Sequence, residues 1–304
     1  MFKNLIIYDL HHKISDFDAV NDAAEKCTFE ETGPTQEKSS GWVPPRGEEY
    51  GAMCESVAGQ WILRFKSEER VIPGSTMQRH MAQKIEAWEK SNGFKPGKKM
   101  IREMRDDAKL DLLPNAVIRQ KATWVWIDNK AKRLYIDTAM QSRADAIVSL
   151  LVETVKGIAL SLLSTESSPQ STMAHWLMTQ EPAEGFDIGR ECELKACDES
   201  KAIVRYKNHP LDIDEVREHV ENGKLPTKLA LCFDDRVSFV LTDSLKLTNI
   251  RLLDAVLGDA DPEEDAFDTD VALSTGELNI LIPDLIDALG GKDDGEDEDP
   301  AADL

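Results

Sequence analysis

Three side chains in the second half of the sequence have the types and order of a metal-dependent nuclease site. Asp187 precedes the triplet Glu193-Leu194-Lys195, in which two carboxylates could hold a divalent metal ion while the lysine ammonium steadies a hydroxide. A Glu-x-Lys triplet arises often by chance in a chain that is 31% charged. We therefore predict that the protein is not an enzyme, and we keep nuclease activity as the weakest hypothesis.

Other catalytic and metal-binding patterns are missing from the sequence. The five cysteines are irregularly spaced, and the closest pair, Cys192 and Cys197, has no second Cys or His pair at zinc spacing. The acidic run Asp259-Ala260-Asp261-Pro262-Glu263 contains a proline and lacks the glycine that a calcium-binding EF-hand loop needs at its sixth position. We expect reduced thiols, no metal ion and no cofactor.

Positive charge is concentrated in one part of an acidic chain. The formal net charge is −21, from 57 Asp and Glu against 36 Lys and Arg. The window from Trp61 to Arg143 nevertheless holds 18 bases and 10 acids, a net of +8, which leaves −29 for the remaining residues. A protein with such separated charges can bind a polyanion on one surface and repel it from the others.

Bases near the ends of predicted elements could contact nucleic-acid phosphates. Few aromatic residues lie among these basic side chains, so we expect contacts with the DNA backbone and no stacking on nucleobases. The alternative is that they are ordinary solvated surface residues. The candidate DNA-binding residues are Lys95, Lys98, Lys99, Arg102, Arg119, Lys121, Arg205, Lys207, Lys224 and Lys228.

Hydrophobic periodicity around the basic window predicts helices and antiparallel strands. Helical spacing from Met77 to Lys109 is interrupted by Asn92-Gly93 and Lys95-Pro96-Gly97, which predicts two antiparallel helices in a projecting hairpin with little apolar surface. The alternating stretches Trp124–Asp128 and Arg133–Asp137 predict a β-hairpin. Arg119 and Lys121 are expected between the helices and that hairpin.

The region after residue 181 is predicted to be rich in strands. Short β-type stretches predict a paired set at 191–206 and a meander at 228–250, with Asp234-Asp235 at its first turn. Ser274 and Glu277 have the spacing of a capping box that would begin a final helix. Acidic residues 292–304 follow as a disordered tail.

No apolar run approaches the 18 residues of a membrane-spanning helix, and the N-terminal apolar stretch is too short for a signal peptide. The odd set of cysteines also argues against a secreted disulfide scaffold. We expect a cytoplasmic protein that does not contact membranes.

The chain resembles the bacterial recombination-associated RdgC family over about residues 1–291. No single motif is specific to this family, but their order and spacing together are. In chain order the motifs are Phe2-Lys3-Asn4-Leu5, Gly41-Trp42-Val43-Pro44-Pro45, Leu112-Leu113-Pro114, Trp126-Ile127-Asp128, Glu193-Leu194-Lys195, Gly223-Lys224, Thr227-Lys228-Leu229-Ala230-Leu231, Thr275-Gly276-Glu277-Leu278 and Leu289-Gly290-Gly291.

The resemblance implies a DNA-binding homodimer without catalytic activity. Family members close into a ring whose basic hole encircles duplex DNA, and they bind with little sequence preference. They restrain RecA-dependent strand exchange by occupying its DNA substrate, which implies a nucleoid-associated protein. On this basis Leu112, Leu113 and Val117 are candidates for one of the two dimer contacts.

The expected fold is therefore α+β, in a multi-part chain with antiparallel sheets, a projecting helical hairpin and a ring-shaped homodimer. We divide it into a central domain (1–76 and 117–180), a helical tip (77–116), a β-rich base domain (181–291) and the tail (292–304). Double-stranded DNA is the expected partner, with single-stranded DNA a second possibility. An acidic protein that mimics DNA and binds DNA-handling proteins directly is the main alternative.

Overall fold

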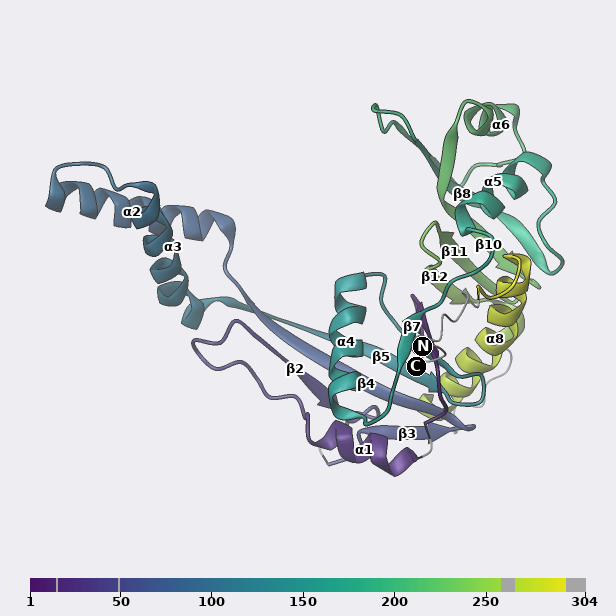
Figure 1. The fold of residues 1–304 in the computed structure, drawn as a ribbon, viewed down its shortest axis with the longest axis horizontal. Helices are drawn as coiled ribbons and strands as arrows, with labels where there is room; N and C mark the ends of the chain where they lie inside the picture. The colour runs from purple at the N-terminus through teal and green to yellow at the C-terminus, as the bar shows by residue number, and fades with distance from the viewer. Residues whose placement is uncertain (15, 49, 258–265, 294–304) are drawn as a thin grey trace, which may run out of the picture. The chain divides into compact units, whose positions relative to one another are not determined.

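The fold combines two antiparallel β-sheets with helices (Figure 1). The computed structural model describes residues 1–304 apart from 15, 49, 258–265 and 294–304. The predicted α+β class and the antiparallel sheets are confirmed.

The first sheet has seven strands in the order β2-β4-β5-β6-β1-β7, with β3 paired to β4. In β4, buried Leu63 and Phe65 alternate with half-buried Arg64 and Lys66, as expected for a strand with one face in the core. The strands are β1 (Ile6–Leu10), β2 (Lys38–Val43), β3 (Cys54–Val57), β4 (Gln60–Val71), β5 (Val117–Asp128), β6 (Arg133–Ile136) and β7 (Leu160–Leu162).

The predicted hairpin of β5 and β6 is confirmed, with Val125 opposite Ile136 and Asp128 opposite Arg133. Strand β5, however, begins at Val117, seven residues before the predicted start. The early part of β5 has six exposed residues in a row, so it has no alternating apolar pattern by which the sequence could have shown it. Arg119 and Lys121 therefore lie within a strand and not in a connection.

The second sheet has five strands in the order β12-β11-β10-β8-β9, which confirms both the predicted pair and the predicted meander. Asp234 and Asp235 both have positive φ, 47° and 52°, at the tight turn between β10 and β11. The strands are β8 (Phe186–Ala196), β9 (Ile203–Lys207), β10 (Lys224–Phe233), β11 (Val237–Thr242) and β12 (Leu247–Leu252).

Helices α2 and α3 form the predicted hairpin, and Gly93 ends α2 in the left-handed conformation. None of the residues of α2 is buried, whereas α3 buries Met104 and Ala108. The predicted antiparallel packing is wrong, because α3 crosses α2 (Figure 1). The helices are α1 (Phe17–Glu25), α2 (Gly74–Asn92), α3 (Lys98–Leu112), α4 (Gln141–Thr154), α5 (Pro169–Thr179), α6 (Asp214–Glu221), α7 (Asp254–Leu257) and α8 (Ala266–Ala288), with the 3-10 turn η1 (Leu113–Asn115).

The predicted capping box is wrong, since α8 already begins at Ala266 and Ser274 lies inside it. Both side chains of the expected box make tertiary contacts instead. Ser274 Oγ accepts a hydrogen bond of 3.1 Å from the Met1 ammonium, and Glu277 pairs with Arg236. A capping box and a buried polar position in a helix can have the same local sequence.

The chain forms two compact units. Unit 1 comprises residues 1–17, 55–62 and 124–304, and unit 2 comprises residues 18–54 and 63–123, so that β4 and β5 contribute residues to both. In unit 1 the core includes Trp126 stacked on Tyr135 at 3.9 Å between ring centroids. In unit 2, Trp42 packs edge-on against Phe65 at 5.6 Å.

The predicted tail begins too early. Lys292 forms a β-bridge with Thr165, and the Asp293 amide donates a hydrogen bond to the Ser164 carbonyl, so both residues are part of the fold. Residues 294–304, and the acidic run 259–263, lie outside the described residues. Within the described ranges, no helix has both the length and the apolar character needed to cross a bilayer.

Candidate nucleic-acid interface

One face of α3 carries a stripe of bases. Lys98, Arg102, Arg105 and Lys109 are spaced by four, three and four residues, so they lie one above another on one side of the helix, over about 16 Å. The side of α3 that packs into the core carries the buried residues Met104 and Ala108. The amphipathic pattern of α3 thus holds the basic stripe toward solvent.

Most of this stripe lacks acidic partners. Lys109 pairs with Glu37 at 2.6 Å, but within the described part of the chain Lys98, Arg102 and Arg105 have no ion pair, and neither has exposed Lys95 just before the helix. The candidate Lys99 is exposed and lies 3.9 Å from Glu103.

The first turn of α3 is itself electropositive. Lys98 and Lys99 are its first two residues, and it contains no acidic residue. Their charges add to the partial positive charge that every helix has at its N-terminus. Acidic side chains normally occupy such positions. Placing bases there costs helix stability, a cost that a bound anion would relieve.

Arg119 and Lys121 are two further exposed bases of unit 2, at the outer part of β5. Neither has an ion pair among the residues that the structure describes. The structure therefore assigns six of the ten candidates to unit 2: Lys95, Lys98, Lys99, Arg102, Arg119 and Lys121.

In unit 1, two of the other candidates meet on the exposed face of the five-stranded sheet. Glu193 of β8 lies between Arg205 of β9 and Lys228 of β10, because the strand registers pair it with both. The Arg205 Nε atom lies 2.5 Å from Glu193 Oε2, Lys228 Nζ lies 3.7 Å from the same oxygen, and Thr227 donates a hydrogen bond of 2.8 Å to Oε1. The hydrogen bond from Arg205 and the other contacts lower the pKa of Glu193.

The remaining two candidates lie near this row. Lys207 ends β9 opposite Glu191 and is exposed, without an ion pair in the described ranges. Lys224 begins β10, and its Nζ atom lies 3.0 Å from His219 Nδ1. Unlike the stripe on α3, this group of bases is partly neutralised by its own carboxylates.

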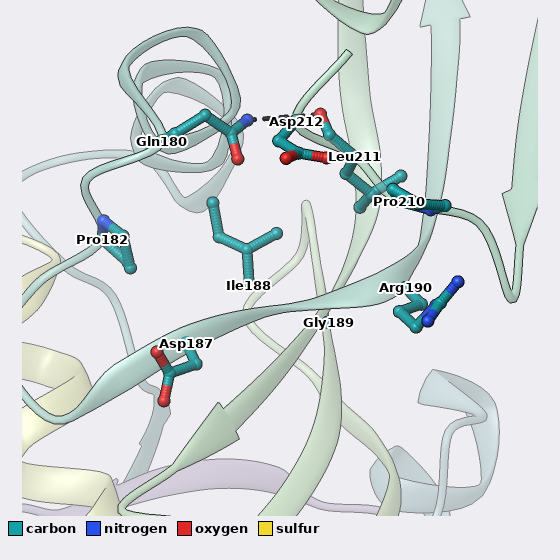
Figure 2. Close-up of a pocket in the computed structure, with 9 residues that line it drawn as sticks. All are labelled: Gln180, Pro182, Asp187, Ile188, Gly189, Arg190, Pro210, Leu211 and Asp212. Atoms are coloured by element: carbon teal, nitrogen blue, oxygen red, sulfur yellow. Dashed lines mark hydrogen bonds between the residues drawn. The ribbon is translucent and has the colours of Figure 1, made fainter.

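The geometry does not favour the nuclease arrangement. Asp187 and Glu193 are six residues apart in β8, roughly 15–20 Å along the strand, and Glu193 is held by two bases. Figure 2 shows the pocket of about 360 Å³ beside Asp187, in which Ile188 points toward Gln180 and Asp212 while Asp187 lies on the other side of the strand. Among the described residues, no three His, Cys, Asp or Glu side chains gather as a metal site.

The candidate dimer residues differ in exposure. Leu113 is only 1% exposed and lies in the core of unit 2, whereas Val117 is 62% exposed and its neighbour Ile118 is 49% exposed. Leu112 is half-buried. A contact with a second copy of the chain at this place would therefore use Val117 and Ile118, with Leu113 as internal support.

A buried carboxylate ties the root of the α2–α3 hairpin to the sheet. Glu68, 2% exposed, accepts hydrogen bonds from the Thr32 amide and hydroxyl and from Gln120 Nε2. Arg70 donates to the Thr32 hydroxyl and carbonyl and to the carbonyls of Leu113 and Pro114, directly after α3. These contacts fix the C-terminal end of the helix that carries the basic stripe.

The comparisons with known proteins agree with the motifs. A family model described as "Putative exonuclease, RdgC" matches residues 1–292. The chain belongs to the RdgC family. A "Recombination-associated protein RdgC" of Dechloromonas aromatica is 36% identical over 96% of this chain and 98% of its own length, and proteins of the same name from Bordetella pertussis and a Janthinobacterium strain are 34% and 36% identical over the same shares.

One feature of this RdgC-family chain escaped the sequence analysis. Lys66 Nζ lies 4.5 Å from the centroid of the Phe29 ring, which places an aromatic residue beside a base of the positive window. The two residues are 37 positions apart, and no local pattern connects them. The contact arises because the segment before β2 folds back over that strand.

The Glu68 contacts generate a pH-dependent prediction. Hydrogen bonds from the Thr32 and Gln120 side chains hold the pKa of Glu68 at about 2, well below its ordinary value of 4.5. The ionised form therefore stabilises the folded state above pH 4.5, and this contribution is lost as the pH falls toward 2. We expect Glu68→Gln to lower the free energy of unfolding of this RdgC-family protein at pH 7 and to lose most of that effect near pH 2.

Urea unfolding followed by circular dichroism at several pH values measures this difference. Glu69→Gln is the matched control, because Glu69 is an exposed neighbour whose pair with Lys38 contributes little. A Glu68→Gln effect that is the same at pH 7 and near pH 2 would show that the charge of Glu68 is not what stabilises the fold.

Proposed function

We propose that this RdgC-family protein binds DNA through its phosphate backbone, without sequence preference, as a dimeric ring that encircles duplex DNA. By occupying DNA it would limit the access of RecA and so modulate homologous recombination. The names of the relatives, "Recombination-associated protein RdgC", support the recombination role.

The observation that carries the proposal is the stripe on α3. Three of its four bases, Lys98, Arg102 and Arg105, are exposed and have no acidic partner in the described ranges, so each can contact a phosphate and release its counterions. These basic side chains lie on a helix surface with few aromatic neighbours. Such a surface binds the backbone and does not read base edges.

The distribution of charge between the two units supports the same proposal. Unit 2 contains 17 Lys and Arg against 16 Asp and Glu, whereas unit 1 contains 19 against 41. Because unit 2 is nearly neutral, a polyanion repels it much less strongly than it repels the acidic unit 1. Closure of a ring would add topological retention, so that each phosphate contact could remain weak.

Charge reversal on the stripe tests the proposal directly. We expect the triple change Lys98→Glu, Arg102→Glu and Arg105→Glu to weaken binding of random-sequence duplex DNA. Because each lost phosphate contact removes about one unit from the slope of log affinity against log salt, the slope should fall by about three. Fluorescence anisotropy at several salt concentrations measures both quantities.

The control is Lys13→Glu, Lys26→Glu and Lys130→Glu, which makes the same change in net charge at exposed sites that are not part of α3. An equal loss in both triple variants would mean that net charge alone sets the affinity. No binding of the unmodified protein at about 50 mM salt would refute the DNA-binding proposal and favour an acidic protein that mimics DNA.

The family description makes nuclease activity the competing function, and Glu193 separates the two. A nuclease would lose Mg²⁺-dependent cleavage in Glu193→Gln. In the DNA-binding proposal the same change frees Arg205 and Lys228 from their carboxylate, so we expect severalfold tighter binding of duplex DNA. Incubation of linear DNA with Mg²⁺ or Mn²⁺, together with the binding assay, distinguishes the two functions. Metal-dependent cleavage that disappears in Glu193→Gln would establish nuclease activity.

The proposed ring generates a prediction about Val117. We expect Val117→Asp to open one dimer contact without unfolding the chain, since the side chain is 62% exposed. Retention on closed circular DNA should then fall more than affinity for short linear duplex. Ile280→Asp, at a 53% exposed apolar residue of α8, is the control; equal losses on circular and linear DNA would argue against encirclement.

A further inference from the structure

Unit 2 contains a pocket whose lining includes one candidate DNA-binding residue, Lys121, together with residues that the functions above do not use. It has a volume of about 540 Å³ and is lined by Arg64 and Lys66, which lie on the same face of β4. Its walls are Phe29, Val43, Pro44 and Met53. The volume is within the range of small-molecule sites and is sufficient for a single nucleotide.

Gly41 is the residue that brings Phe29 to this pocket. A side chain at position 41 would meet the backbone of Cys27 and Phe29 at 2.5–2.6 Å, so only glycine allows the segment before β2 to cross so closely. Backbone hydrogen bonds hold the crossing: the Phe29 amide donates to the Trp42 carbonyl, and the Trp42 amide donates to the Cys27 carbonyl. The ring is therefore fixed at its root.

Lys66 is held inside the pocket by that ring. Its ammonium lies 4.5 Å from the ring centroid, so a cation–π contact keeps the charge at the wall of the pocket. Two residues earlier on the same face of β4, Arg64 contributes a guanidinium group. Lys121 of β5 also lines the pocket. An aromatic face, three cations and apolar walls are thus brought together from separate segments of the chain.

This combination recognises a ligand that is flat at one end and anionic at the other. We propose that the pocket binds one nucleotide, with its base on Phe29 and its phosphate beside Lys66 and Arg64. The proposal rests on the DNA-binding function and deepens it, because it gives the protein a site for an unpaired nucleotide of single-stranded DNA. Free nucleotides have the same chemistry and are distinguished in the experiment below.

Binding would exchange one contact for two. The ammonium of Lys66 would leave the ring for the phosphate, and the base would take its place on the ring. Stacking of a base on an aromatic side chain is a stronger contact than an exposed cation–π pair, and the new ion pair adds to it. The side-chain oxygen of Gln120 and the exposed Glu48 carboxylate supply acceptors at the lining for hydrogen bonds from the edge of a nucleobase.

Phe29→Leu and Phe29→Tyr test the proposal as a matched pair. The probes are an oligothymidylate with one central 2-aminopurine, an abasic oligomer of the same length, and free thymidine monophosphate. We expect the 2-aminopurine fluorescence to be quenched by the unmodified protein and by Phe29→Tyr, but not by Phe29→Leu. The preference for the base-containing oligomer over the abasic one should fall roughly 5- to 150-fold in Phe29→Leu.

Lys66→Ala should weaken all probes that carry a phosphate, whereas Lys38→Ala, at an exposed lysine of the neighbouring strand β2, should not. Quenching by the oligomer without binding of the free nucleotide identifies single-stranded DNA as the source. Equal affinity for base-containing and abasic oligomers, or displacement of the oligomer by an acidic peptide as effectively as by nucleotide, would overturn the proposal.

Duplex DNA is measured in parallel so that the two proposals can fail separately. If duplex DNA binds with a steep salt dependence and the 2-aminopurine signal is unchanged by Phe29→Leu, the nucleotide pocket is refuted and the backbone-binding function stands. If neither DNA binds at about 50 mM salt, the function itself is refuted.

Discussion

The ionised carboxylate of Glu68 is the interaction on which the arrangement of unit 2 depends. A carboxylate with only 2% exposure is costly unless its oxygens are hydrogen-bonded, and Thr32 and Gln120 satisfy them from two different segments. Arg70 extends the network to the carbonyls that follow α3. Because α2 buries none of its residues and α3 buries only Met104 and Ala108, this anchor adds to the limited core packing that holds the hairpin.

The same unit shows how an acidic protein can expose a group of bases. Charge is separated locally, by the amphipathic pattern of α3, and not by a basic domain. The contrast with the five-stranded sheet is instructive, since Glu193 there neutralises Arg205 and Lys228 within their own row. The bases of α3 are therefore less neutralised by neighbouring carboxylates than those of the five-stranded sheet.

Local sequence patterns predicted the elements but not the contacts between them. The break between helices α2 and α3, the β5–β6 hairpin and the turn at Asp234-Asp235 were predicted correctly because glycine, proline and alternation act over a few residues, whereas the packing angle of α2 and α3 was not (Figure 1). The Thr32–Glu68 and Phe29–Lys66 contacts join residues 36 and 37 positions apart, which no periodicity encodes. The predicted helix start at Ser274 was wrong for the converse reason. Its local pattern fits a helix start, but Ser274 lies inside α8 and contacts the Met1 ammonium.

The bridge between Leu5 and Leu247 in unit 1 has a consequence for biosynthesis. Their backbone groups exchange hydrogen bonds of 2.7 and 3.1 Å, so the N-terminal segment cannot complete its pairing until residue 247 has left the ribosome. Unit 2 ends at residue 123 and is complete on the order of ten seconds earlier at ordinary translation rates. During that interval the growing chain presents its basic stripe beside ribosomal RNA, before most of its acidic residues have been made.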